Sequence, residues 1–208
     1  MSSINKKHCL FFKWVFAFAI LFFNTATAQL NNDSVFSASA ISGIPLHDVQ
    51  TNKNVYLKEL QNKKAFRLFV FLSPECPLCQ NYSNKLNDFN QQYAANVIMY
   101  GIIPGKAYSE NGIKKFIEDY NIQFKLLIDN DKKLTSYLHA VVTPQAILLN
   151  DKNQLVYKGA IDDWAVALGK QRVTTTKYYL RDALQQSLSH KTVLIKRTKA
   201  VGCRINDY

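Results

Sequence analysis

The chain has 208 residues, of which 26 are Lys or Arg and 15 are Asp or Glu, so its formal net charge is +11. This length is enough for one domain with a sizeable core. The basic residues are scattered and form no run interleaved with aromatic residues, so the composition argues against a nucleic-acid-binding protein.

Residues 1–28 have the order of a secretory signal peptide. A polar stretch with lysines is followed by the apolar run 14–23 and then by small residues up to Ala28, an order typical of exported proteins. The apolar run is shorter than the about 20 residues that cross a membrane as a helix. We therefore expect cleavage near Ala28 and a periplasmic or otherwise exported protein. Cys9 precedes the apolar run and would leave with the signal peptide.

The remaining chain is expected to begin with a polar, flexible leader at residues 29–40. Residues 41–60 place Gly, Pro and Asn around short apolar pieces, which suits a small hairpin before the main sheet. The continuous apolar run 65–72 has strand length and predicts a central strand buried on both faces. Across residues 77–93 the apolar residues recur at helical spacing, which predicts a helix with one buried stripe.

Further along, strands and helices alternate before a hairpin and a last helix. We expect strands at 97–103 and 124–128, helices at 109–120 and 131–139, a hairpin of 141–149 with 154–158, a surface loop at 160–173 and a closing helix at 175–189. This order predicts an α/β fold with one central mixed sheet flanked by helices and an N-terminal hairpin extension. The domain would span residues 41–190, and a tail at 191–208 would carry Cys203.

Two cysteines separated by Pro77 and Leu78 directly follow the expected central strand. Cys76 falls at the N-cap of the expected helix, where unpaired backbone N–H groups and the helix dipole lower the pKa of a thiol. Cys79 lies one turn further on and is better shielded. We therefore expect Cys76 to be the attacking thiolate and Cys79 to resolve the mixed disulfide. A purely structural bridge is the weaker explanation, because so short a loop constrains the unfolded chain little.

The buried strand, the Cys-Pro-Leu-Cys sequence at the start of a helix and the later Thr143-Pro144 dipeptide resemble thioredoxin-fold redoxins and disulfide reductases. Segments 157–163, 176–184 and 201–205 resemble exported bacterial redoxin-domain proteins of the AhpC/TSA type. The resemblance implies that Pro144 is in cis beside the cysteine pair. It also implies that the Thr143 backbone is free to align an extended substrate, and it calls for no cofactor and no metal.

Two departures from the family leave the proton acceptor for Cys79 unassigned. Thioredoxins carry a buried Asp where this chain has Val70, and some exported reductases carry a Glu where it has Tyr82. Glu75 adjoins Cys76 and is expected to face solvent, where its charge would slightly raise the thiol pKa. Since no positive residue separates the cysteines, the sequence favours a mid-range to reducing potential.

Two other functions fit parts of the sequence. A thiol peroxidase of the peroxiredoxin type would need a hydroxyl near the reactive cysteine. Ser73 is suitably placed before Cys76, but Phe69 stands where that family has Pro. A Sco-like copper-binding assembly factor would use the two cysteines with a distant imidazole. His139 is the candidate, although its position suits a cap or surface residue better.

Cys203 is the odd cysteine of the expected exported chain. The sequence leaves several roles open for this accessory thiol: a second resolving thiol, a regulatory disulfide with Cys79, an intermolecular link, or a shielded free cysteine under the tail. Trp164 is expected to anchor its own loop.

Our overall interpretation is an exported, monomeric thiol–disulfide oxidoreductase that reduces the disulfides of other exported proteins. It would need a membrane electron donor, because an oxidising compartment does not regenerate dithiols.

Overall fold

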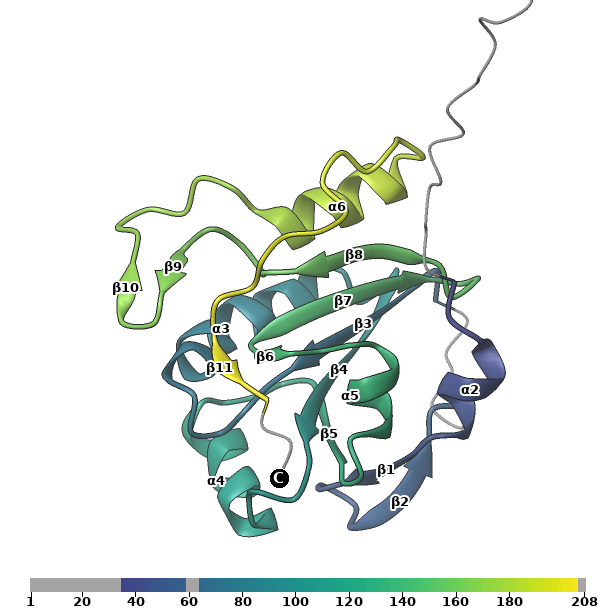
Figure 1. Ribbon diagram of the computed structural model, residues 1–208, viewed down its shortest axis with the longest axis vertical. Helices are drawn as coiled ribbons and strands as arrows, with labels where there is room; N and C mark the ends of the chain where they lie inside the picture. Colours follow the sequence, from purple (N-terminus) through teal and green to yellow (C-terminus); the bar gives the residue numbers. More distant parts are fainter. Residues whose placement is uncertain (1–34, 59–63, 206–208) are drawn as a thin grey trace, which may run out of the picture. The chain divides into compact units, whose positions relative to one another are not determined.

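The computed structural model describes residues 35–58 and 64–205 (Figure 1). The signal peptide expected at residues 1–28 lies outside the described residues, as does the first half of the leader expected at 29–40. Within the described ranges, no helix is both long enough and apolar enough to cross a membrane.

In the part of the chain that the structure describes, seven strands form one mixed sheet in the order β2-β1-β5-β4-β3-β7-β8 (Figure 1). The central strands β3, β4 and β5 run parallel, while β7, β8, β1 and β2 pair antiparallel with their neighbours. Their bounds are β1 Pro45–Asp48, β2 Lys53–Tyr56, β3 Phe66–Phe71, β4 Val97–Pro104, β5 Lys125–Asp129, β7 Gln145–Asn150 and β8 Leu155–Gly159. The fold is a thioredoxin-like α/β fold, so the expected fold class is confirmed.

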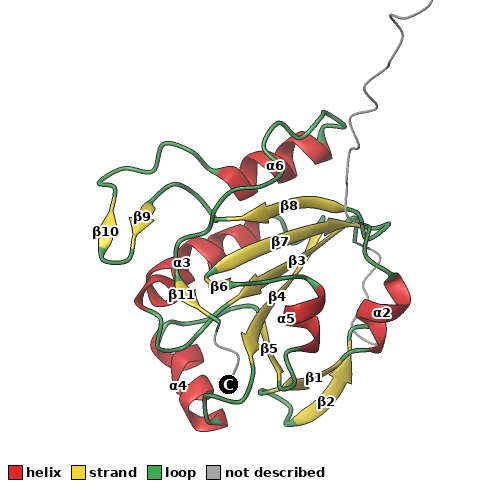
Figure 2. Cartoon of the chain, viewed as in Figure 1, coloured by secondary structure: helices red, strands yellow, loops and turns green. Residues whose placement is uncertain are grey.

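Helices cover both faces of this sheet (Figure 2). Their bounds are α2 Ala38–Gly43, α3 Pro77–Gln92, α4 Glu110–Asp119, α5 Lys133–Tyr137 and α6 Tyr179–Leu188. Buried residues of α3, α4 and α6 share one hydrophobic cluster, and those of α2 and α5 share the other. The layers are therefore helix, sheet and helix, as expected when each face of a central sheet must be kept from water.

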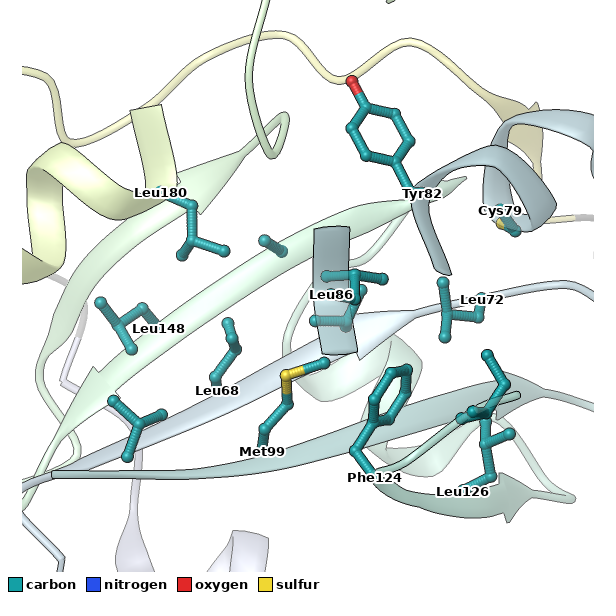
Figure 3. Packing of buried hydrophobic residues seen from close by; sticks show 14 of the residues in the cluster. Leu68, Leu72, Cys79, Tyr82, Leu86, Met99, Phe124, Leu126, Leu148 and Leu180 are labelled. Atoms are coloured by element: carbon teal, nitrogen blue, oxygen red, sulfur yellow. The ribbon is translucent and has the colours of Figure 1, made fainter. Parts of the chain in front are cut away.

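Strand β3 is the element that holds the site in place. Its side chains alternate between the two clusters: Leu68 and Val70 pack toward α3, while Phe69 and Phe71 pack toward the opposite face. All four are fully buried, and each such burial stabilises the fold by about 1.5–3 kcal/mol. Figure 3 shows Leu68 packed among residues of the α3 side. The end of β3 is thus fixed from both faces, close to the point where α3 begins.

The N-terminal part differs from the expectation in two details. The hairpin of β1 and β2 is present, but β1 also pairs antiparallel with β5 and so extends the main sheet instead of standing before it. Helix α2 begins inside the stretch expected to be a flexible leader. The Ser37 hydroxyl accepts a hydrogen bond from the backbone N–H of Ala40, and Phe36 is buried against the same cluster as α2.

The stretch expected to be a surface loop, residues 160–173, contains two short strands, β9 Ala165–Ala167 and β10 Lys170–Gln171, which pair antiparallel. Two buried carboxylates, Asp162 and Asp163, lie before this small hairpin. The closing helix α6 starts at Tyr179, later than the expected residue 175, because residues 175–178 instead form loop contacts, among them hydrogen bonds to Asp163.

The C-terminal segment, defined here as residues 191–205, returns across the molecule after α6 (Figure 1). It first runs beside β8, where the Lys158 N–H donates to the Lys196 carbonyl at 2.9 Å and the Thr198 N–H donates to the Lys158 carbonyl at 3.0 Å. It then forms β11 Cys203–Arg204, which pairs antiparallel with β6 Val142–Thr143. Residues 193–195 form no strand but are docked: Val193 packs against the α3-side cluster, and the N–H of the exposed Leu194 donates to the Gln186 side chain at 2.9 Å.

Candidate active site

The reactive end of the cysteine pair lies at the start of α3. Cys76 is the N-cap residue with extended backbone, and Pro77 takes the first helical position, where its missing N–H costs nothing. Although it stands at a helix terminus, Cys76 is only 1% exposed. Its Sγ lies 3.2 Å from the carbonyl oxygen of Thr143 and 2.9 Å from the Sγ of Cys203.

The Thr143–Pro144 peptide bond is cis, as the family resemblance implied. The expectation that the Thr143 backbone is free is wrong for this structure, because Cys203 pairs with it across β6 and β11. The Ile205 N–H adds a hydrogen bond to the Val141 carbonyl at 3.0 Å. The strand edge beside the cis-proline is therefore occupied by the chain's own C-terminal segment.

The surroundings of Cys76 favour its thiolate. A hydrogen bond from the Cys79 side chain, followed by one from Cys203, lowers the pKa of Cys76 to about 4 against the opposing effect of burial. The backbone N–H groups of Cys79 and Cys203 act in the same direction. A thiol with this pKa would be ionised at neutral pH, which is the state that nucleophilic attack requires. The low pKa also acts against the reducing potential that the sequence favoured, because a stabilised thiolate favours the dithiol form.

Cys79 has the opposite character. It is 0% exposed, and burial raises its pKa well above the ordinary value, with the neighbouring Cys76 adding to the rise. The Ser73 backbone N–H donates to its Sγ at 3.4 Å. Val70 occupies the position where thioredoxins carry an acid and is itself fully buried. Cys79 is thus a protonated, shielded thiol next to an ionised one, which is the arrangement needed for a resolving cysteine.

Cys203 is the third sulfur of the site and is only partly buried. Burial, together with its hydrogen bond and its proximity to the Cys76 charge, raises its pKa to about 11. The sequence left open whether Cys203 meets Cys79, another molecule or nothing. The structure places it against Cys76, although the two residues lie far apart in the chain.

A small pocket of about 120 Å³ opens beside Cys203. Its lining includes Ser73, Tyr108, Thr143 and three cationic residues, which are Lys106, Lys132 and Arg204. The Ser73 and Tyr108 hydroxyls lie 2.6 Å apart. Tyr108 was missed from the sequence, where it reads as a plain loop residue. The pocket would suit a small anionic group more readily than a neutral one.

Near the cysteines, the Tyr82 side chain holds the loop after β8 in place. Its hydroxyl donates to the buried Asp162 carboxylate at 2.5 Å, and the Lys85 ammonium binds the same carboxylate at 2.7 Å. Trp164 packs edge-on against the Tyr82 ring at 5.4 Å, which matches its expected role as a loop anchor. In Figure 3 the Tyr82 ring extends away from the Leu68 part of the cluster. This network was missed from the sequence, where Asp162 looked like part of a polar turn.

The geometry offers little support for a copper-binding or a peroxidase function. His139 is exposed, and its carbonyl accepts a hydrogen bond from Lys158. Among the described residues, no group of three or more His, Cys, Asp or Glu side chains is arranged to hold a metal ion. Ser73, the candidate hydroxyl of a peroxidase, is hydrogen-bonded to Tyr108. Glu75 faces solvent, as expected.

Fold and site together define a thioredoxin-like protein whose cysteine pair opens a helix opposite a cis-proline. A family model described as the AhpC/TSA family matches residues 40–158. The chain therefore belongs to the AhpC/TSA family. A comparison with curated proteins finds no match.

Solved structures of similar fold come from several bacteria. A hypothetical protein of Sinorhizobium meliloti 1021 is 24% identical, with a TM-score of 0.67, over 77% of this chain and 88% of that one. An uncharacterized conserved protein of Geobacillus kaustophilus is 22% identical, with a TM-score of 0.72, over 86% and 94%. A secreted Mycobacterium tuberculosis disulfide oxidoreductase is 17% identical, with a TM-score of 0.49, over 57% and 84%. At these identities the similarity of the first two concerns the fold.

Proposed function

We propose that this protein is a thiol–disulfide oxidoreductase that reduces disulfides of exported proteins through Cys76 and Cys79. One arrangement carries the proposal: Cys76 is the N-cap of α3 beside the cis-proline, and Cys79, one helical turn further on, is fully buried. The opposite directions of their pKa shifts agree with an ionised nucleophile and a protonated resolving thiol. The family and the fold support the same chemistry. The Thr143–Pro144 edge would align the substrate chain after the C-terminal segment that pairs with it has moved aside.

The reaction would proceed by two exchanges. The Cys76 thiolate attacks one sulfur of a substrate disulfide, which forms a mixed disulfide and releases the first substrate thiolate. Once Cys76 is in a disulfide, its negative charge is gone, and with it one of the causes that raise the pKa of Cys79. Cys79 then loses its proton and attacks the Cys76 sulfur, which releases the second substrate thiolate and leaves a Cys76–Cys79 disulfide.

The low pKa of Cys76 restricts the substrates. A stabilised thiolate makes the dithiol form of the enzyme less reducing, so structural disulfides with potentials below about −300 mV are poor substrates. Strained or mispaired disulfides of exported proteins have higher potentials and suit it better. Export is proposed from the signal-peptide order of residues 1–28, and in an oxidising compartment the dithiol would be regenerated by a membrane donor.

The test compares the protein with its Cys76→Ser variant and its Cys79→Ser/Cys203→Ser double variant in reduction of insulin disulfides by a dithiol donor. We expect loss of activity in Cys76→Ser. A mixed disulfide on Cys76 should accumulate in the double variant, because Cys79 is missing and Cys203, whose Sγ lies 2.9 Å from that of Cys76, can no longer resolve it. Wild-type activity in Cys76→Ser would refute the proposal. Turnover of hydrogen peroxide without disulfide reduction would instead indicate a peroxidase.

A further inference from the structure

We propose that Cys203 is a third redox thiol, an internal partner that takes the disulfide over from the buried Cys76–Cys79 pair and presents it at the surface. The proposal rests on the proposed function of that pair and assigns a role to the C-terminal segment. It concerns the step after substrate reduction, in which the oxidised site must be returned to the dithiol form.

Strand β11 is docked on the edge beside the cis-proline. Cys203 pairs with Thr143 and Arg204 pairs with Val142 in antiparallel register, which is the way an extended peptide adds a strand to an open edge. Gly202 makes the approach close: a Cβ atom at this position would lie 2.1 Å from the Thr143 carbonyl oxygen. The C-terminal segment thus lies along the edge beside the cis-proline, and its cysteine faces the nucleophile. It occupies this edge as a tethered substrate would.

The three cysteines differ in their exposure to solvent. Cys76 is 1% exposed and Cys79 is 0% exposed, so a disulfide between them would be out of reach of an external thiol in this conformation. Cys203 is partly exposed and lines the pocket of about 120 Å³ described above. Among the three cysteines described, it is therefore the one that an electron donor can reach without prior displacement of the C-terminal segment.

Cys203 and Cys76 lie in direct contact. The Sγ atoms of Cys203 and Cys76 lie 2.9 Å apart, and a disulfide needs about 2.05 Å. Only a small movement separates the observed contact from a bond. Cys76 is common to both disulfides, and Cys203 already contacts its sulfur. The exchange therefore needs no rearrangement of α3.

The exchange conserves atoms, electrons and charge. Cys203 loses its proton and attacks the Cys76 sulfur; the Cys76–Cys203 bond forms, the Cys76–Cys79 bond breaks, and Cys79 leaves and takes up a proton. An external dithiol then attacks the Cys203 sulfur, releases the Cys76 thiolate and closes its own disulfide, which leaves Cys203 as a thiol. The oxidant is the substrate disulfide of the preceding cycle, and the reductant is the external dithiol.

The experiment maps disulfides by mass spectrometry in the purified protein and in its Cys79→Ser and Cys203→Ser variants, after equilibration in dithiothreitol redox buffers. We expect the Cys79→Ser variant to keep a reversible disulfide between Cys76 and Cys203, and the Cys203→Ser variant to keep the one between Cys76 and Cys79. If the Cys203 thiol of Cys79→Ser stays free under oxidising conditions that consume the Cys76 thiol, the proposal is overturned.

The rate at which the disulfide is reduced distinguishes a redox role of Cys203 from a role in which this residue only shields the site. Serine at 203 retains the backbone pairing with Thr143, so the oxidised Cys203→Ser variant keeps its buried disulfide covered but lacks the relay. We expect dithiothreitol to reduce it more slowly than the wild type. An equal or faster rate would show that Cys203 only covers the site. Disulfide reduction that survives in Cys76→Ser would contradict the proposed function itself, so the two failures are distinguishable.

Discussion

Replacing Gly202 by Ala tests the contact between the C-terminal segment and Thr143 without changing any cysteine. The new Cβ would lie 2.1 Å from the Thr143 carbonyl oxygen and 2.6 Å from its carbon, whereas ordinary contact begins at 3.4 Å. Both partners are backbone atoms beside the cis-proline, so neither can move aside as a flexible side chain would. The pairing of Cys203 with Thr143 must therefore open.

Overpacking of this kind costs about 1–3 kcal/mol, and we expect the free energy of unfolding of the reduced protein to fall by that amount. The loss of the hydrogen bond from Cys203 should raise the pKa of Cys76, because that bond is one of the causes that lower it. Cys76, which is 1% exposed, should also become more accessible to solvent. Its alkylation by iodoacetamide at neutral pH should become faster.

The assay is urea unfolding together with alkylation followed by peptide mass spectrometry. Gly43→Ala is the matched control, since a Cβ atom there meets nothing within 4 Å. Gly43 ends helix α2, where Ala is neutral or stabilises by up to about 1 kcal/mol. If Gly202→Ala leaves both the stability and the alkylation rate of Cys76 unchanged, the C-terminal segment does not cover the site and the reasoning is refuted.

Three further predictions concern charges in and near the site. Tyr82→Phe removes the hydroxyl that donates to the buried Asp162 carboxylate and should lower the free energy of unfolding in urea by about 1.5–3 kcal/mol; an unchanged value would refute it. The pKa of Cys76, lowered from 9.0 to about 4, stabilises the reduced fold most above pH 9, and this contribution should decline as the pH falls to about 4. The ultraviolet absorbance of the thiolate should stay constant below pH 9 and fall only near pH 4, so a fall centred near pH 9 would contradict the prediction. The Thr176 hydroxyl lowers the pKa of Asp163 to about 2, so Thr176→Val should raise that pKa toward 3.8 in an NMR titration; no change would argue against this hydrogen bond.

The local features of the site could be predicted from the sequence because each has a local cause. The apolar run that ends at Leu72 gave the buried strand, and the position of Pro77 gave the helix start at Cys76. The cis state of Pro144 came from the family resemblance and not from physical reasoning on the residues.

The features that could not be predicted are contacts between distant segments. Nothing near Cys203 in the sequence indicates that the C-terminal segment returns to the edge at Thr143, because the two residues lie far apart in the chain. Likewise the burial of Asp162 and Asp163, which fall in the stretch expected to be a surface loop, depends on partners in other elements and loops. The occupied edge beside Pro144 follows from the same long-range contact. The site therefore contains three thiols, whereas the sequence predicted a pair of cysteines and left the role of Cys203 open.

The most direct test of the central claim is a redox titration of the purified protein against dithiothreitol buffers, with thiols counted by alkylation at each step. We predict one reversible two-electron couple that involves Cys76, with a potential above the about −270 mV of thioredoxin because the Cys76 thiolate is stabilised. The couple should be absent from Cys76→Ser. A protein that shows no reversible couple, or one that persists in Cys76→Ser, would contradict the account.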